Sequence, residues 1–153
     1  MDIEEIRKIK IKNLDNLSAY RKTLYEKPIL HDLFLEVTSR CNARCEHCGS
    51  SCGYEIPDYE ISADEIKKVL LSVAQKYDAK KILLNVTGGE PLMRKDLFAI
   101  MDYANNLGYP WGMTTNGMLI NDEIIKNMIA TNMKTISISL WAGSSRRGRP
   151  RSG

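Results

Sequence analysis

Residues 41–48 read Cys41-Asn42-Ala43-Arg44-Cys45-Glu46-His47-Cys48, and this stretch decides how the rest of the chain is interpreted. Three of the four cysteines fall within these eight residues, with three residues between the first pair and two between the second. Thiolates at this spacing on one loop can converge on a single inorganic centre, as they do in ferredoxin-type runs. A structural zinc site takes four protein ligands, whereas a catalytic zinc takes three and a water. Three closely spaced thiolates suit three corners of an iron–sulfur cubane whose fourth iron is left open.

The composition is that of an ordinary globular domain. The chain has 153 residues, of which 43% are apolar and 27% charged. No apolar run approaches the roughly 18 residues of a membrane span, and the charged start lacks the apolar core of a signal peptide. All four cysteines are crowded between residues 41 and 52, whereas a disulfide scaffold spreads them out. We therefore expect a cytoplasmic protein with no membrane association.

The net charge of +3 comes from the end of the chain. Residues 141–153 contain no acid and four arginines, and without these arginines 18 basic residues face 19 acidic ones. The remaining chain shows no nucleic-acid footprint, so we expect no nucleic-acid partner. The same segment has no aliphatic side chain larger than alanine, which predicts a disordered or non-native tail.

Strand and helix patterns alternate between residues 33 and 140. Apolar runs predict strands at 33–38, 82–86, 110–114 and 135–140, the first of them buried. Helices are predicted between them: one opened by the capping box of Ser62 and Glu65, one at 97–107, and one capped by Asn121. This order predicts an α/β fold with a parallel sheet and right-handed crossovers, either a layered sheet or part of a barrel. Residues 1–32 are expected to be a lead-in with a short helix at 17–27, ended by Pro28.

The second strand is followed by Thr87-Gly88-Gly89-Glu90-Pro91-Leu92. Ligands of open α/β sheets bind beyond the carboxyl ends of the strands, so this turn lies where a ligand is expected. Glycines allow main chain to approach a ligand closely, although a Gly-Gly pair alone is as well explained by a turn. The next strand ends at Thr115-Asn116-Gly117, and Ser137 and Ser139 share one face of the last strand.

Taken together and in this order, these segments resemble the radical S-adenosylmethionine (SAM) enzymes over residues 33–140. The resemblance implies that Cys41, Cys45 and Cys48 ligate a [4Fe-4S] cluster and that SAM chelates the remaining iron. It implies that the GGEP segment and three later positions bind SAM, namely Gly88, Gly89, Glu90, Pro91, Asn116, and the strand residues Ser137 and Ser139. No side chain of this chain is assigned a catalytic role beyond holding these cofactors.

The resemblance also implies a partial (βα) barrel and a mechanism. A one-electron reductant such as a flavodoxin or ferredoxin would reduce the cluster, SAM would be cleaved, and a 5′-deoxyadenosyl radical would abstract hydrogen from a substrate. The loop around Cys48 and Cys52 resembles members that modify peptides or proteins, so such a substrate is one expectation. Because the resemblance stops at Leu140, we expect domains at 1–32, 33–140 and 141–153, and a core truncated after the fourth strand that is itself inactive.

A different class of function stays open at this point. Cys52 lies outside the three-cysteine pattern, and as a fourth ligand it would close the site around zinc or a four-cysteine cluster and exclude SAM. The chain would then be a non-catalytic metal-binding module. The segment at residues 88–91 distinguishes the two hypotheses, because a metal clip has no need of it.

Overall fold

The computed structural model describes residues 1–45, 48–50, 52–53 and 59–140. The chain divides into two compact units, Met1–His31 and Asp32–Gly153. The first unit is built on one long helix and the second on a sheet with helices. The tail predicted at 141–153 lies outside the described residues, and the domain limits inferred from the sequence stay a prediction.

The helix of the first unit, α1 (Ile3–Glu26), is much longer than the helix predicted at 17–27. A capping box starts it: the Asp2 side chain accepts from the Glu5 amide at 2.8 Å, and Glu5 accepts from the Asp2 amide at 3.1 Å. These bonds satisfy amides that a helix start otherwise leaves free. Because no glycine or proline interrupts the 24 residues that follow, the helix runs on to the position just before Lys27.

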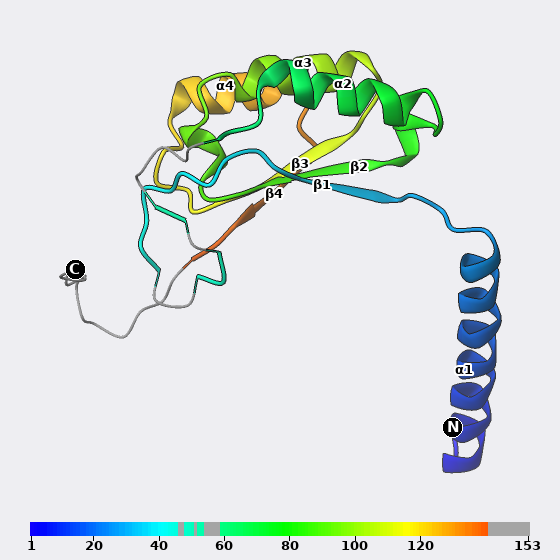
Figure 1. Ribbon diagram of the computed structural model, residues 1–153. Helices are drawn as coiled ribbons and strands as arrows, with labels where there is room; N and C mark the ends of the chain where they lie inside the picture. Colours follow the sequence, from blue (N-terminus) through cyan, green and yellow to red (C-terminus); the bar gives the residue numbers. More distant parts are fainter. Residues whose placement is uncertain (46–47, 51, 54–58, 141–153) are drawn as a thin grey trace, which may run out of the picture. The chain divides into compact units, whose positions relative to one another are not determined.

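The second unit is a parallel α/β sheet, as predicted. Four strands lie in the order β1 (Asp32–Glu36), β2 (Leu83–Thr87), β3 (Trp111–Thr115) and β4 (Thr135–Ile138), each parallel to its neighbour. The helices α2 (Ala63–Ala74), α3 (Leu97–Asn106) and α4 (Asp122–Ala130) lie together over one face of the sheet (Figure 1). Two short 3-10 turns, η1 (Ala79–Lys81) and η2 (Pro91–Met93), precede β2 and α3.

The core lies between the two central strands and the helices. Its fully buried side chains come from β2 and β3 and from α2 and α3, and they include Leu84, Val86, Trp111, Leu70, Leu97, Ile100, Met101 and Ala104. The polar atoms buried with them are paired: the Trp111 indole donates to the Thr131 carbonyl at 2.8 Å, and the Tyr109 hydroxyl donates to the Leu70 carbonyl at 2.8 Å. The central strands are therefore held to the helices by both apolar and polar contacts.

The prediction that the first strand is buried was wrong. β1 alternates exposed and half-buried residues, and the Phe34 side chain is 70% exposed. All four residues of β4 are exposed as well. The reason is position: within the described part of the chain, β1 and β4 each pair with a single neighbouring strand.

The helices bury one face against the sheet. On α3 the fully buried residues are Leu97, Ile100, Met101 and Ala104. On α2 they are Ile66 and Leu70, whereas Val69 is 44% exposed.

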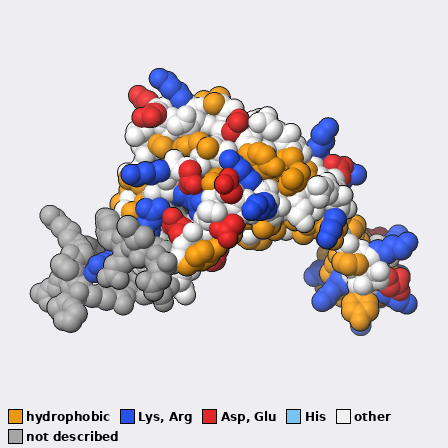
Figure 2. Space-filling model, turned by 45° about the horizontal axis from the view of Figure 1, so that its top comes forward, with side chains coloured by type: hydrophobic (Ala, Val, Ile, Leu, Met, Phe, Trp, Pro, Cys, Tyr) orange, Lys and Arg blue, Asp and Glu red, His pale blue; other side chains and the backbone are white. Residues whose placement is uncertain are grey.

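Charged side chains of both signs are interspersed with apolar patches on the helical face (Figure 2). No helix in the described ranges is both long and apolar enough to cross a bilayer.

The neighbours Leu70 and Leu71 offer a matched test of this core. Leu70 is fully buried, whereas Leu71 is 40% exposed on the same helix. Leu70→Ala should lower the free energy of unfolding by about 2–5 kcal/mol because it leaves a cavity under α2. Leu71→Ala should cost about 1 kcal/mol or less. Denaturant unfolding followed by circular dichroism measures both, and equal losses would contradict the packing described.

Candidate functional site

All four cysteines lie on the connection between β1 and α2, at the carboxyl edge of the sheet. Each is a free thiol. Cys41 and Cys52 are half-buried, whereas Cys45 and Cys48 are exposed. Two local hydrogen bonds shape the loop around Cys48. The Cys48 amide donates to the Cys45 carbonyl at 3.1 Å, and the Cys48 thiol donates to the Ser50 carbonyl at 2.9 Å.

The backbone around Cys41 is held from both sides. On one side the Gly89 amide donates to the Thr38 carbonyl and the Glu90 amide to the Arg40 carbonyl, each at 2.7 Å. On the other side Arg40 forms a parallel bridge with Gly53, and the Cys41 amide donates to the Gly53 carbonyl at 2.7 Å. The backbone that leads into Cys41 therefore has residues 89–90 on one side and Gly53 on the other.

The two glycines make this approach possible. A Cβ atom on Gly88 would lie 2.3 Å from the Thr38 carbonyl oxygen, and one on Gly89 would lie 2.2 Å from that of Arg40. Gly88 also has a φ of +142°, which a residue with a side chain rarely adopts. The sequence assigned these glycines to a cofactor, and that role stays a prediction. The main chain that they approach in the structure is the start of the cysteine loop.

Glu90 links this turn to the end of β3. Its side chain is fully buried. One carboxylate oxygen accepts from the Leu92 amide at 3.1 Å and the Thr115 hydroxyl at 2.8 Å. The other accepts from the Asn116 amide at 2.7 Å. A buried carboxylate needs such donors because it has left water, and these three join the carboxyl ends of two neighbouring strands.

Asn116 brings the end of β3 to the cysteine loop. Its side-chain amide donates to Asn42 Oδ1 at 2.7 Å and lies 4.0 Å from the Cys41 sulfur. Its own side-chain oxygen accepts from the Met118 amide at 3.0 Å. The structure thus places one predicted SAM-binding residue directly beside the first predicted cluster ligand.

The other predicted SAM-binding residues lie nearby in the fold. Pro91 is buried as the first residue of η2. Ser137 pairs in register with Thr114. Because residues alternate along β3 and its Trp111 points to the helices, Ser137 lies on the sheet face without helices, and Ser139 follows it two residues later. No bond within the described residues joins either serine side chain to the cysteine loop.

Cys52 lies close to the other cysteines although it is outside their pattern. The bridge between Arg40 and Gly53 brings its segment alongside Cys41. Burial raises the pKa of the Cys52 thiol above its ordinary value, and negative charge on Cys48, Cys41 and Glu36 raises it further. Within the described residues, however, no three His, Cys, Asp or Glu side chains are grouped closely enough to hold a metal ion. The convergence of Cys41, Cys45 and Cys48 stays a prediction.

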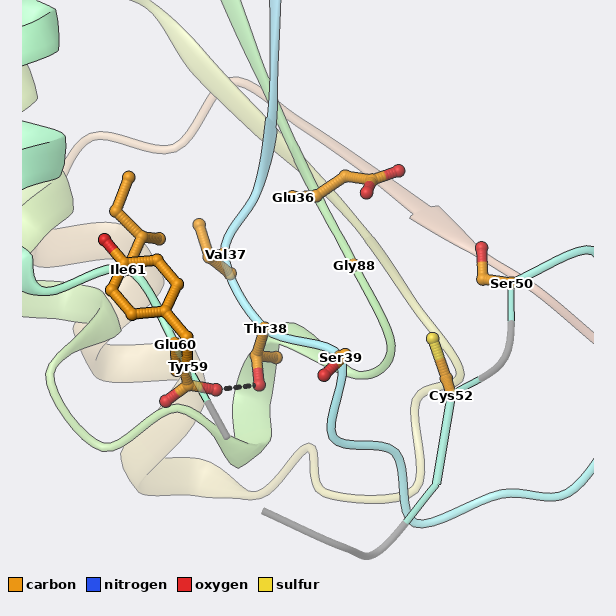
Figure 3. Close-up of a pocket in the computed structure, with 10 residues that line it drawn as sticks. All are labelled: Glu36, Val37, Thr38, Ser39, Ser50, Cys52, Tyr59, Glu60, Ile61 and Gly88. Carbon is orange, nitrogen blue, oxygen red and sulfur yellow. Dashed lines mark hydrogen bonds between the residues drawn. The ribbon is translucent and has the colours of Figure 1, made fainter. Parts of the chain in front are cut away.

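A pocket of about 350 Å³ opens beside the loop (Figure 3). Its wall contains carboxylate, hydroxyl and thiol groups from the end of β1 and from both arms of the loop, including Glu36, Thr38, Ser39, Cys52 and Glu60. Gly88 forms part of the same wall. The pocket therefore places polar groups of the cysteine loop next to the glycine turn.

Two residues that hold the loop were missed by the sequence analysis. Arg94 is 5% exposed, and one nitrogen of its guanidinium donates to the carbonyls of Val37 at 2.7 Å and Ile61 at 2.8 Å. The hydrogen bonds from Arg94 to Asp96 lower the pKa of that carboxyl group. Glu60 binds the start of the loop from across it. Neither residue belongs to a recognisable motif, so only the folded chain identifies them.

Comparison with known proteins gives one family. A sequence model described as the radical SAM superfamily matches residues 35–152. An AdoMet-dependent heme synthase of Methanosarcina barkeri is 34% identical over 105 residues, which cover 69% of this chain and 29% of that protein. A probable GTP 3′,8-cyclase of Saccharolobus solfataricus is 39% identical over 116 residues, covering 75% of this chain and 36% of that protein. The chain thus spans about a third of the length of these curated relatives.

Solved structures share the fold. BtrN in complex with AdoMet and 2-DOIA superimposes with a TM-score of 0.64 at 18% identity, covering 76% of this chain and 48% of BtrN. Streptococcus suis SuiB bound to S-adenosylmethionine gives a TM-score of 0.58 at 18% identity, covering 85% of this chain and 29% of SuiB.

The close approach of the glycine turn to the cysteine loop can be tested by adding one methyl group. Gly88→Ala and Gly89→Ala should each lower the free energy of unfolding by about 1–3 kcal/mol, because backbone must move to admit the Cβ atom. They should also expose the Cys41 thiol to alkylation. Gly49→Ala is the matched control, since a Cβ atom there meets nothing within 4 Å. Wild-type thiol reactivity in both glycine variants would show that the approach is not needed.

The buried carboxylate of Glu90 gives a second test. Glu90→Gln should lower the free energy of unfolding by about 1–3 kcal/mol, because an amide NH₂ group cannot accept from the backbone donors that it would face. Glu123→Gln on exposed α4 is the control and should be nearly neutral. Thermal unfolding of the two variants separates the outcomes, and a Glu90→Gln protein as stable as the control would refute the bonding described.

Proposed function

The chain belongs to the radical SAM superfamily, and we propose that it binds a [4Fe-4S] cluster and SAM at the carboxyl edge of its sheet to generate a 5′-deoxyadenosyl radical. The family uses these two cofactors. The curated relatives that this chain resembles are enzymes by name, the heme synthase and the GTP cyclase. Because the chain covers only part of their length, the reaction of the whole protein belongs to the proposal.

One observation carries the proposal: three segments far apart in the sequence meet at one place. Residues 88–90 pair with the backbone that leads into Cys41, and Asn116 lies against that cysteine. Glu90 joins the glycine turn to Asn116 through buried bonds. A metal clip made of cysteines alone has no need of such links to two strand ends, and they support a site built for a second ligand.

The donor set suits the cluster. Cys41, Cys45 and Cys48 are free thiols on one loop, and thiolates are the usual ligands of iron–sulfur centres. When bound, the reduced cluster supplies the electron that cleaves SAM and yields the 5′-deoxyadenosyl radical. The electron would come from a one-electron reductant such as a flavodoxin or ferredoxin.

The protein's own residues would hold SAM mainly through backbone. The Glu90 carboxylate already accepts from three donors and is shielded from solvent. We assign to Glu90 the placing of the turn, and to the main chain of residues 88–90 the contact with the SAM ammonium group. Pro91 starts η2 and fixes where that turn ends. Asn116, Ser137 and Ser139 are proposed as further SAM contacts from the neighbouring strands.

The substrate is proposed only as a class. A peptide or protein remains the hypothesis drawn from the loop around Cys48 and Cys52. The curated relatives are named for heme synthesis and for GTP cyclisation, and SuiB, a more distant neighbour in fold, was also solved with the precursor peptide SuiA.

A four-cysteine metal module is the second candidate, because the contact of Gly53 with Arg40 and Cys41 brings the neighbouring Cys52 alongside Cys41. As a fourth thiolate it would close the site, so the two candidates differ in what Cys52 does. In the proposed enzyme Cys52 lines the pocket and ligates nothing.

Substitution of each cysteine tests the proposal. After anaerobic reconstitution with iron and sulfide, Cys41→Ala, Cys45→Ala and Cys48→Ala should each lose the visible absorbance and iron content of a thiolate-ligated cluster. Cys52→Ala should keep both. SAM should change the EPR spectrum of the reduced cluster in the wild-type and Cys52→Ala chains, since SAM binding does not require turnover. Loss of the cluster in Cys52→Ala, with no SAM-induced spectral change in the wild-type chain, would favour the four-cysteine module.

A further inference from the structure

Three cross-links close the base of the cysteine loop at successive levels. The outward arm of the loop is residues 37–41, and the return arm is residues 59–61 with Gly53 ahead of it. The outermost link is Arg94, which binds one carbonyl on each arm. The innermost is the backbone bridge between Arg40 and Gly53, which encloses all four cysteines. Glu60 forms the link between these two.

The Glu60 carboxylate contacts two residues of the outward arm. It accepts a short hydrogen bond from the Thr38 hydroxyl, which Figure 3 shows pointing at it across the pocket wall. It also accepts from Arg40 Nη2 at 3.0 Å and Arg40 Nε at 3.3 Å. The Thr38 oxygen in turn accepts from the Arg40 amide at 3.1 Å. One carboxylate thus fixes both the side chain and, through Thr38, the backbone of the residue before Cys41.

The ion pair between Arg40 and Glu60 is largely shielded from solvent. The side chains of Arg40 and Glu60 are 19% and 24% exposed, and Thr38 is 5% exposed. Partial burial raises the pKa of Glu60, but the hydrogen bonds from Thr38 and Arg40 outweigh it and hold the pKa below its ordinary value. The carboxylate is therefore charged at neutral pH. Charge-assisted, two-point contacts of this kind are stronger than an exposed surface pair.

We propose that Glu60 is a positioning residue that fixes Cys41 for cluster binding by clasping Thr38 and Arg40 from the return arm. Its effect on the cluster rests on the proposed function, whereas its effect on the loop does not. Glu60 acts close to the cysteine, because its partner Arg40 directly precedes Cys41. The Arg40 carbonyl accepts from the Glu90 amide, and the Cys41 amide donates to Gly53.

Glu60 favours cluster binding because it orders the base of the cysteine loop before the cluster binds. A loop whose ends are tied loses less conformational entropy when its ligand orders it. Arg94 secures the arms one residue further out, at Val37 and Ile61, so it holds the loop to the sheet. Glu60 is the closest side-chain link to Cys41 that crosses between the arms within the described residues. Its loss should loosen the cysteine without unfolding the sheet.

The test compares three single variants with the wild-type chain, all without cluster. Glu60→Gln keeps the size of the side chain but removes its charge, and Arg40→Gln removes the partner. Asp78→Asn is the matched control, because Asp78 forms an ion pair with Lys81 at 3.5 Å on η1, away from the loop, and asparagine caps the turn equally well. Amide hydrogen exchange is followed at Cys41 and at Val86 in the core strand β2.

In Glu60→Gln the Cys41 amide should exchange about tenfold faster, the expected effect of losing a charge-assisted contact. Val86 should exchange as in wild type, and Asp78→Asn should change neither. If Glu60 acts through Arg40, the Glu60→Gln/Arg40→Gln double variant should be no faster than either single variant. Unchanged exchange at Cys41 would overturn the proposal, and so would equal acceleration at Cys41 and Val86, which would show only a loss of global stability.

Cluster reconstitution then separates the role of Glu60 in fixing Cys41 from the proposed function of the chain. With Glu60→Gln the iron bound per chain should fall at limiting iron and recover at excess, and Glu60→Asp should restore part of it. If the Glu60→Gln loop is loosened but binds iron as the wild type does at limiting iron, the proposed effect of Glu60 on cluster binding is overturned. A wild-type chain that binds no cluster would sink the proposed function instead, while the exchange result would still decide whether Glu60 fixes Cys41.

Discussion

The contact on which the site depends is the main-chain approach of residues 88–90 to residues 38–40. Two hydrogen bonds of 2.7 Å form where a single Cβ atom would collide with a carbonyl oxygen. This approach extends the sheet beyond the end of β1 and carries Cys41 to the carboxyl edge. It also sets Glu90 where its carboxylate can reach the end of β3. The first cysteine, the glycine turn and Asn116 are therefore one connected unit.

Local sequence predicted the elements of the fold but not their surroundings. The capping residues Ser62 and Asn121 start α2 and α4 as expected, because a cap is a contact between residues three apart. Whether a strand is central or at an edge depends on its neighbours in space. For this reason the apolar run that forms β1 was wrongly taken as buried, while the equally apolar β2 is buried at Leu84 and Val86. The capping box of Asp2 and Glu5 was a local signal that the prediction of a short helix overlooked.

The residues of the candidate site likewise fall into two groups, those that the sequence identifies and those that only the folded chain identifies. The cysteine spacing, the Gly-Gly turn and Asn116 are visible because each is a short pattern at the end of a strand. Glu60 and Arg94 carry no such pattern, because their partners lie 22 and 57 residues away at Thr38 and Val37. The sequence also gave no reason to connect the two glycines with the cysteine loop itself, since the pairing of β1 and β2 brings them together only in the folded chain.

The loop therefore has a base and an outer part with different physical roles. The Cys41 amide is bonded to Gly53 and the residue before it to Glu90, whereas Cys45 and Cys48 are exposed. Ordering exposed ligands uses part of the free energy of metal binding, because binding and local folding are coupled. A half-buried ligand with fixed backbone has little ordering left to do. The base thus decides where a cluster would sit relative to the glycine turn, and both parts of the loop decide how tightly it would be held. Loosening the base at Thr38, Arg40 or Glu60 would add an ordering cost at Cys41 to the cost that the exposed Cys45 and Cys48 carry already.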